Sequence, residues 1–221
     1  MIDYYIFFLK FFELDLYDRS FERILSAIGN AIGDCEENIR KANSTGDEYY
    51  TWAVTDDEVD VVENLLGTAY VFCQTYITKT VSDVKALHCH HNKSNPSSML
   101  KTTADSKESI VCFGSDRIPP GYTKVQVIDA FANYFKHGDE WGPDWSKLPK
   151  QSEKTAEVMS AAGAASGSTG NLRQGSRVLG NKDFKNTILF HDIIKSWRTE
   201  LYVSYKAELQ NLGLISPSAD L

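Results

Sequence analysis

The chain has 221 residues, enough for one substantial core, and its 42% hydrophobic and 24% charged residues are typical of a folded globular protein. The net charge of −7 is uneven, because residues 1–70 carry 15 acidic and 5 basic residues, which leaves +3 for the remaining 151. An acidic protein repels the nucleic-acid backbone at long range, which argues against non-specific nucleic-acid binding as the default function but leaves open a local site in the mildly basic remainder.

The opening stretch from Ile2 to Phe12 is apolar and aromatic but contains Asp3 and Lys10. A membrane-spanning helix needs about 18 apolar residues, and a signal peptide needs a positive start and a small-residue cleavage site. We therefore predict a strand or helix packed on the core, with a hydrophobic partner surface as the alternative. The cysteines have no CxxC spacing, which favours reduced, mostly buried thiols in a cytoplasmic protein: Cys35, Cys73, Cys89 and Cys112.

Two long helices are predicted in the first half of the chain. The first covers about 18–42, with apolar residues at steps of three and four: Phe21, Leu25, Ile28, Ile32, Cys35 and Ile39. The second covers 56–88, opened by a capping box from Thr55 to Glu58, and its near-heptad apolar spacing favours a core helix of a bundle over a dimer seam. Residues 92–122 are predicted to form a long connection with a short strand at 110–113.

The second half begins with another capping box, Thr123 to Gln126, which predicts a helix over 124–137 that ends at Gly138. A loop with two tryptophans and a short helix at about 152–162 follow. Small residues and four basic residues predict a flexible basic loop over 163–185, which lacks the pattern of a phosphate-binding P-loop. With a final helix over 186–212 and a frayed tail over 213–221, the sequence predicts an all-α, single-domain bundle of four to six helices.

The end of the 124–137 helix carries the strongest candidate site. At 100° per residue, Asn133, Lys136 and His137 share one face, opposite the apolar residues, and Glu140 would join them if the turn continued. The helix dipole favours a charged imidazole at a C-terminus, and a cationic His beside a Lys suits stabilising a phosphate or an oxyanion. The alternative is a solvated helix end with a capping His.

The segment from Asn133 to His137, after a helical bundle and before an acidic and aromatic turn, resembles the motif of HEPN-domain proteins. These are α-helical bundles, often dimeric, of bacterial toxins, CRISPR-associated nucleases and phage defence. The resemblance implies a metal-independent ribonuclease motif of Arg, a polar residue, about three variable residues and His. His137 matches the His and Asn133 the polar residue, whereas Ala132 stands where the Arg is expected. Lys136 or Arg198 would then supply the positive charge, although Lys is a poorer bidentate phosphate partner than Arg.

Other candidate groups each have a simpler interpretation. His88 and His91 have the spacing of two zinc ligands, but the sequence offers no second pair, so an exposed helix end is expected in place of a metal site. The acids between Asp56 and Asp60 are explained by the start of a helix, which favours negative charge. Around Gly175 and Gly180 a basic segment would contact phosphate or simply be solvated: Arg173, Arg177, Lys182 and Lys185.

Two functions are consistent with these observations. The first is a HEPN-like protein that binds or cleaves RNA in a bacterial toxin or phage-defence context, with His137, Asn133 and Lys136 as the active group. Substrate-binding residues would then be Arg198, Arg173, Arg177 and Trp141. The second is a non-catalytic protein–protein interaction module, in which the same residues and the loop with Trp141 and Trp145 bind a partner such as an antitoxin or a defence component. Neither function calls for a cofactor or a membrane, and a homodimer is compatible with both.

Overall fold

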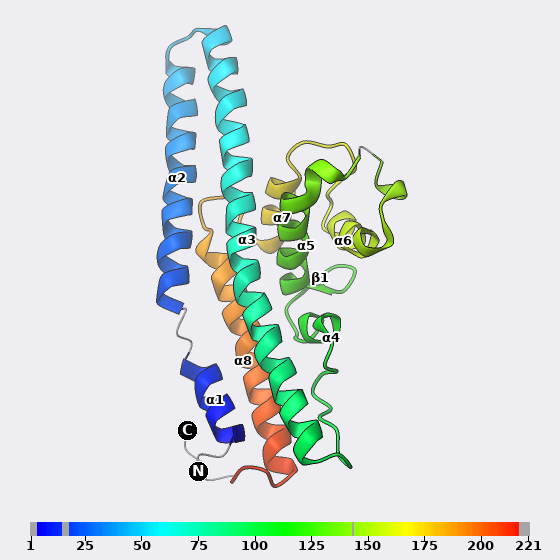
Figure 1. Ribbon diagram of the computed structural model, residues 1–221. Helices are drawn as coiled ribbons and strands as arrows, with labels where there is room; N and C mark the ends of the chain where they lie inside the picture. The colour runs from blue at the N-terminus through cyan, green and yellow to red at the C-terminus, as the bar shows by residue number, and fades with distance from the viewer. Residues whose placement is uncertain (1–3, 15–17, 143, 217–221) are drawn as a thin grey trace.

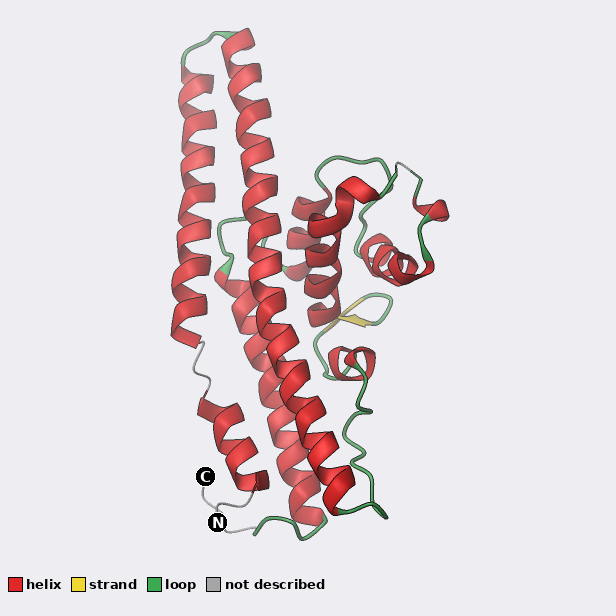
Figure 2. Ribbon diagram, viewed as in Figure 1, coloured by secondary structure: helices red, strands yellow, loops and turns green. Residues whose placement is uncertain are grey.

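The computed structural model of the protein describes residues 4–14, 18–142 and 144–216. It confirms the all-α class: the described part of the chain folds into one helical domain whose only sheet is a pair of two-residue strands (Figure 2). More helices form than the sequence predicted, because two short segments that were expected to be loop or strand are helical.

The first helix, α1 (Tyr4–Leu14), packs one face on the core, as the sequence predicted for a helix or strand at this end. Its buried side chains are Tyr5, Phe8, Leu9 and Phe12, whereas Phe7 and Leu14 are exposed. The next helix, α2 (Asp18–Ser44), buries the first five positions of its predicted apolar stripe. Ile2 and Asp3 lie outside the described residues.

The third helix, α3 (Glu48–Ser94), is 47 residues long and starts earlier than predicted. Asp47 caps it by accepting a hydrogen bond from the backbone N–H of Tyr50 at 3.0 Å. Thr55 is therefore not a cap but an interior residue, and its hydroxyl donates to the carbonyl of Thr51 at 2.7 Å. The capping box expected at Thr55 was wrong because Asp47, eight residues upstream, supplies a competing cap.

The connection after α3 also differs from the prediction. A short helix, α4 (Lys107–Val111), capped by Ser106, replaces the first half of the strand expected at 110–113, and no strand forms in the second half. The two strands β1 (Arg117–Ile118) and β2 (Tyr122–Thr123) pair antiparallel and lead into α5 (Lys124–His137). The Thr123–Gln126 capping box is confirmed, with both reciprocal hydrogen bonds formed. Gly138 does not end the helix in a left-handed conformation; with φ −59° it continues into the 3-10 turn η1 (Gly138–Glu140).

The remaining elements are η2 (Trp145–Lys147), α6 (Lys150–Ala161), α7 (Asn171–Leu179) and α8 (Ile188–Asn211). The helix α7 corrects the prediction of a continuous loop over 163–185. Gly175, in its middle, allows α7 to approach the Phe131 ring of α5, and burial of Leu172 and Leu179 anchors it. The predicted frayed tail is packed in its first residues, where Ile215 is buried; residues 217–221 lie outside the described part.

These helices pack around α3 (Figure 1). The lower part of α3 lies against α8 and α1, while α5 and α7 cover a different side of its middle, with α6 beyond α5. Aromatic rings join three helices in the core: Tyr70 of α3 stacks on Phe131 of α5 and on Phe190 of α8, with ring centroids 5.4 and 4.9 Å apart. The upper parts of α2 and α3 extend beyond the other helices as a two-helix arm (Figure 1).

Candidate functional site

The predicted site lies at the end of α5, where the helix presents two different faces. Ala132 is fully buried and points into the core with Phe131, whereas Lys136 is exposed and the His137 side chain is 52% exposed. The helix continues far enough for Glu140 to join, as the sequence suggested, and its carboxylate lies 3.2 Å from His137 Nδ1. An imidazole, an ammonium and a carboxylate therefore share one solvent-exposed corner.

Asn133 is held in a separate polar network below this corner. The side-chain amide of Gln74 on α3 donates to the Asn133 oxygen and to the Asp129 carboxylate, both at 2.8 Å. Lys107, the first residue of α4, donates to the same carboxylate at 2.8 Å. Through this bond Asn133 ties α5 to α3, and among the described residues the hydrogen-bonded side-chain partner of His137 is Glu140, not Asn133.

The position that the HEPN motif gives to Arg is Ala132, and its burial leaves no room for a long cationic side chain. Arg198 does not replace that cation. Its guanidinium is buried in the core, where it donates to the hydroxyl of Thr80 at 2.6 Å and to the carbonyl of Phe12 at 3.0 Å. That carbonyl is among the last four of α1, which have no partner within their own helix, so Arg198 caps α1 onto the bundle.

The distance between Arg198 and the α5 end follows from positions on α3. Phe135 of α5 packs against Gly67, and Thr80 lies thirteen residues farther along the same helix. At a rise of 1.5 Å per residue this separation is roughly 20 Å. Arg198 is therefore a structural residue of the core and not part of the predicted site.

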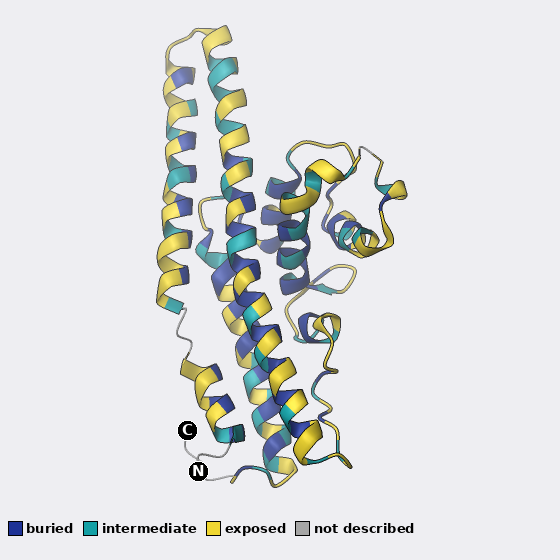
Figure 3. Ribbon diagram, in the orientation of Figure 1, coloured by how far each residue is buried: buried dark blue, intermediate teal, exposed yellow. Residues whose placement is uncertain are grey.

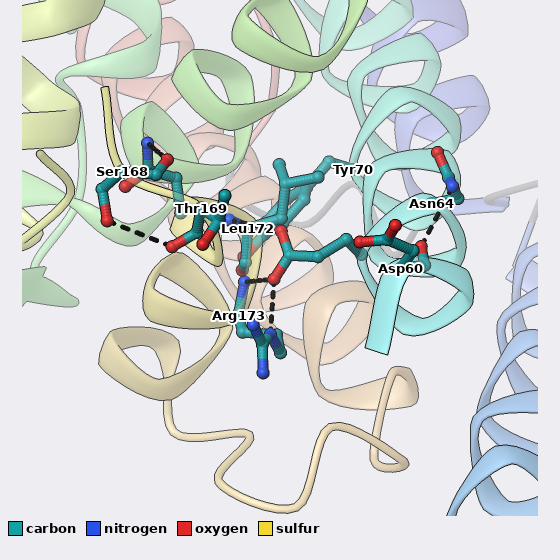
Figure 4. A network of polar contacts seen from close by, with 9 residues as sticks. Asp60, Asn64, Tyr70, Ser168, Thr169, Leu172 and Arg173 are labelled. Atoms are coloured by element: carbon teal, nitrogen blue, oxygen red, sulfur yellow. Dashed lines mark hydrogen bonds and ion pairs between the residues drawn. The ribbon is translucent and has the colours of Figure 1, made fainter. Parts of the chain in front are cut away.

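The basic residues of α7 are also engaged within the fold. Glu63 of α3 accepts hydrogen bonds from the backbone N–H groups of Leu172 and Arg173 and from the Arg173 side chain at 2.6 Å. A carboxylate at a helix N-terminus is stabilised by the helix dipole, so this contact anchors α7 to α3. Figure 4 shows Leu172 and Arg173 facing the stretch of α3 that carries Asp60, Asn64 and Tyr70.

The other basic residue predicted in this helix, Arg177, stacks on the Phe184 ring, with its guanidinium carbon 5.1 Å from the ring centroid. Lys185, farther along, pairs with Glu36 of α2 at 2.7 Å. The basic segment therefore makes internal contacts at three of its four positions. In the described part of the chain no hydrogen bond or ion pair joins Arg173 or Arg177 to His137.

Three aromatic rings form a cluster beside the exposed corner. Tyr134 of α5 meets Trp141 and Trp145 edge to face, with ring centroids 5.4 and 5.9 Å apart, and the two tryptophans are 5.7 Å from each other. All three rings are half-buried. The loop with both tryptophans therefore packs on α5 through Tyr134. That these rings form one binding surface with Lys136 and His137 stays a prediction.

The histidines at the end of α3 correct a prediction, because His88 and His91 are buried and not at an exposed helix end. His88 Nε2 lies 2.9 Å from the hydroxyl of Tyr205 on α8, and His91 Nδ1 lies 3.2 Å from that of Tyr5 on α1. Burial lowers the pKa of His88, so the neutral imidazole is favoured. Within the described ranges, no three His, Cys, Asp or Glu side chains are grouped as metal ligands would be.

A cavity of about 240 Å³ lies between α4, α5 and α6, beside the Asp129 network. Two lysines line it, but Lys107 pairs with Asp129 and Lys154 with Glu108. Neither this region nor the anchoring roles of Gln74 and Glu63 were predicted from the sequence. The only local signal was an amide or a carboxylate inside an apolar stretch of a long helix, since the partners lie 55 to 110 residues away.

Comparison with known proteins yields no relationship: no protein-family model matches the chain, and no curated protein or solved structure is significantly similar to it. Among the described helices, none has the length and apolar character needed to cross a membrane.

Proposed function

We propose that this chain is a non-catalytic helical protein–protein interaction module and that it binds a protein partner at the end of α5. We call this place the α5-end surface and define it by Lys136, His137, Trp141 and Trp145. The observation that carries the proposal is the three-ring cluster of Tyr134, Trp141 and Trp145 next to exposed charged groups. Tryptophan and tyrosine surrounded by polar groups are the residues that contribute most binding energy at protein interfaces.

Binding is favoured over catalysis by the surroundings of His137. Its imidazole is 52% exposed and its partner Glu140 is 75% exposed, so water surrounds both groups. Phosphoryl and acyl chemistry relies on donors held in place where water is excluded, and on a cation aimed at the reacting group. Here the motif position for that cation is the buried Ala132, and the oxygen of Asn133 is already bonded to Gln74.

Quantitative affinity capture from the native cells tests this proposal. Partner recovery should fall at least about tenfold with Trp141→Ala and with His137→Ala, because interface hot spots contribute about 2 kcal/mol or more. Met99→Ala is the matched control, since Met99 is 72% exposed on a different part of the chain. Circular dichroism must show unchanged helix content in all variants. If the amount of partner recovered is the same with both α5-end variants as with the wild type, the assignment of this surface is wrong.

The second candidate is a HEPN-like protein that binds or cleaves RNA in a toxin or phage-defence context. Exposure of both Lys136 and His137 on one turn favours it, because a phosphate in solution can approach both side chains. Incubation with RNA at low salt, followed by gel analysis, tests it. Cleavage that is lost with His137→Ala would support this candidate over the first; intact RNA and no growth defect on expression would remove it.

A further inference from the structure

One face of α3 is covered by α5 and α7 in the middle of the helix and is exposed in its upper, N-terminal part. Five residues lie within about 20° of a single line along the helix, at steps of four and seven: Tyr49, Asp56, Asp60, Gly67 and Gln74. On the lower part of this line α5 packs closely, with Phe135 against Gly67 and Asn133 bonded to Gln74. The uppermost residue of α3 that hydrogen-bonds to α7 is Glu63, so cover from these two helices ends at that level.

Above Glu63 the same face is exposed and carries aromatic rings. Tyr49 is 78% and Trp52 is 63% exposed, and their ring centroids lie 6.2 Å apart. From position 43 to position 61 no residue of the chain is buried, and the tip of α2 and the upper end of α3 are yellow and teal in Figure 3. From Tyr49 to Asp60 the uncovered face is roughly 16 Å long, about three helical turns.

The arm around this face is strongly acidic. Residues 34–60 contain nine acidic and two basic residues, a balance of −7 that equals the net charge of the whole chain. Asp56, Asp57 and Asp60 form no ion pair with any residue that the structure describes. The start of a helix no longer accounts for them, since α3 begins at Glu48, two turns earlier. Like charges four residues apart inside a helix destabilise it, so these acids work against the arm's own stability.

The arm is nevertheless a defined structure, because its two helices are tied to each other near the tip. The hydroxyl of Thr51 donates to the carbonyl of Ala42 at 3.0 Å, and the amide of Asn38 donates to the carboxylate of Glu58 at 2.7 Å. These contacts use the side of α3 that faces α2. They leave the Tyr49–Asp60 face free and hold it in a fixed position, which lowers the entropy cost of binding.

We propose that the Tyr49–Asp60 face of α3 is the docking site for a basic amphipathic helix of a partner protein, which packs on α3 as an upward continuation of the place that α5 occupies. Apolar residues of that helix contact Tyr49 and Trp52, and its lysines or arginines pair with Asp56 and Asp60. A second copy of this chain does not fit, because two arms of this charge repel each other. Nucleic acid is excluded by the same charge.

This inference is independent of the α5-end surface, since none of its residues belongs to that surface. The probe is a synthetic amphipathic helical peptide of about 14 residues, four turns, with leucines on one face and lysines beside them. One control peptide carries glutamate in place of every lysine, and another has the same composition in an order that destroys the apolar face. Binding to the full chain is measured by fluorescence anisotropy.

The basic amphipathic peptide should bind and both control peptides should bind at least about tenfold more weakly. Trp52→Ala and the double variant Asp56→Asn/Asp60→Asn should each weaken binding by a similar factor. The matched control is Asp34→Asn/Glu37→Gln, which makes the same charge change on the outer side of α2 and should leave affinity within about twofold. Trp141→Ala should also leave it unchanged, so failure here and failure of the α5-end proposal are distinguishable.

Three results would each overturn the docking site. They are equal affinity for the control peptide without an apolar face, an equal loss of affinity in Asp34→Asn/Glu37→Gln, and no binding of the basic amphipathic peptide up to about 1 mM. The natural partner is tested by photo-crosslinking in the native cells, with Trp52→p-benzoylphenylalanine in the full chain. Capture of a basic helical segment supports the proposal. Capture of a second copy, of an acidic segment or of nothing overturns it.

Discussion

Replacing Gly175 with alanine tests the largest correction to the sequence analysis, the helix α7. A Cβ atom built on Gly175 would lie 2.7 to 2.8 Å from three carbons of the Phe131 ring. Carbon atoms pack at about 3.5–4.0 Å, so the ring or the helix would have to withdraw by about 1 Å. The Phe131 ring cannot move aside without displacing its neighbours, because Phe131 is fully buried and stacked on Tyr70.

Two opposing effects set the size of the change. Overpacking a filled core costs about 1–3 kcal/mol, whereas alanine in a helix interior is about 1 kcal/mol more favourable than glycine. We expect Gly175→Ala to lower the free energy of unfolding by up to about 2 kcal/mol. For a chain of this size such a loss lowers the melting temperature by up to about 8 °C. Urea unfolding followed by circular dichroism, and a thermal melt, measure both quantities.

A matched glycine on α2 provides the control. A Cβ on Gly33 would meet only the flexible Lys185 side chain, at 3.5 Å, so Gly33→Ala should stabilise the protein by up to about 1 kcal/mol. In a Phe131→Leu background, the penalty of Gly175→Ala should shrink, which a double-mutant cycle detects. If Gly175→Ala is as stabilising as Gly33→Ala, residues 171–179 do not pack as a helix on α5 and the reasoning is refuted.

Three further predictions concern buried groups. Arg198→Met should lower the free energy of unfolding by about 2–4 kcal/mol, because two charge-assisted hydrogen bonds are lost. The same variant should make α1 accessible to limited proteolysis. Unchanged protection of α1 would contradict the capping role of Arg198. Burial lowers the pKa of His88 below its value in the unfolded chain, so the unfolded state binds more protons. The free energy of unfolding should therefore fall as the pH drops below about 6.5. His88→Gln should flatten this pH dependence, and an equally steep profile in that variant would assign the dependence to other groups. With a thiol reagent the exposed Cys89 should react at once, while Cys35, whose pKa burial raises to about 12, and the buried Cys73 should react only after unfolding. Labelling of Cys35 or Cys73 in the folded protein, identified by peptide mapping, would contradict their burial.

The elements that were predicted well depend on signals within a few residues of each other. The α5 helix begins at Thr123 because the hydroxyl and the Gln126 side chain satisfy each other's backbone groups, which is visible in four consecutive residues. The stripe of α2 needed only a period of three and four, since that spacing places apolar groups on one side of any helix. The all-α class followed from several such stripes, and the structure confirms it.

Competing local signals were resolved by packing. Both Asp47 and Thr55 are good caps, but α3 starts at the first because the added turns lie along α2, where Thr51 bonds to Ala42. Residues 163–185 have the composition of a loop, yet part of them is helical because Gly175 lets α7 reach Phe131. Packing against a distant segment outweighs weak local propensity, and such a segment is not visible in a local window.

The functional groups show the same division. The face that unites Asn133, Lys136 and His137 followed from helical periodicity, and as a functional site it stays a prediction. Which groups are available was set by partners far along the chain: Arg198 is withdrawn into the core by a carbonyl 186 residues away. Periodicity fixes which side chains share a face of a helix, because that depends on backbone geometry alone. Whether that face meets water or another helix depends on contacts between distant segments, which form only when the chain has folded.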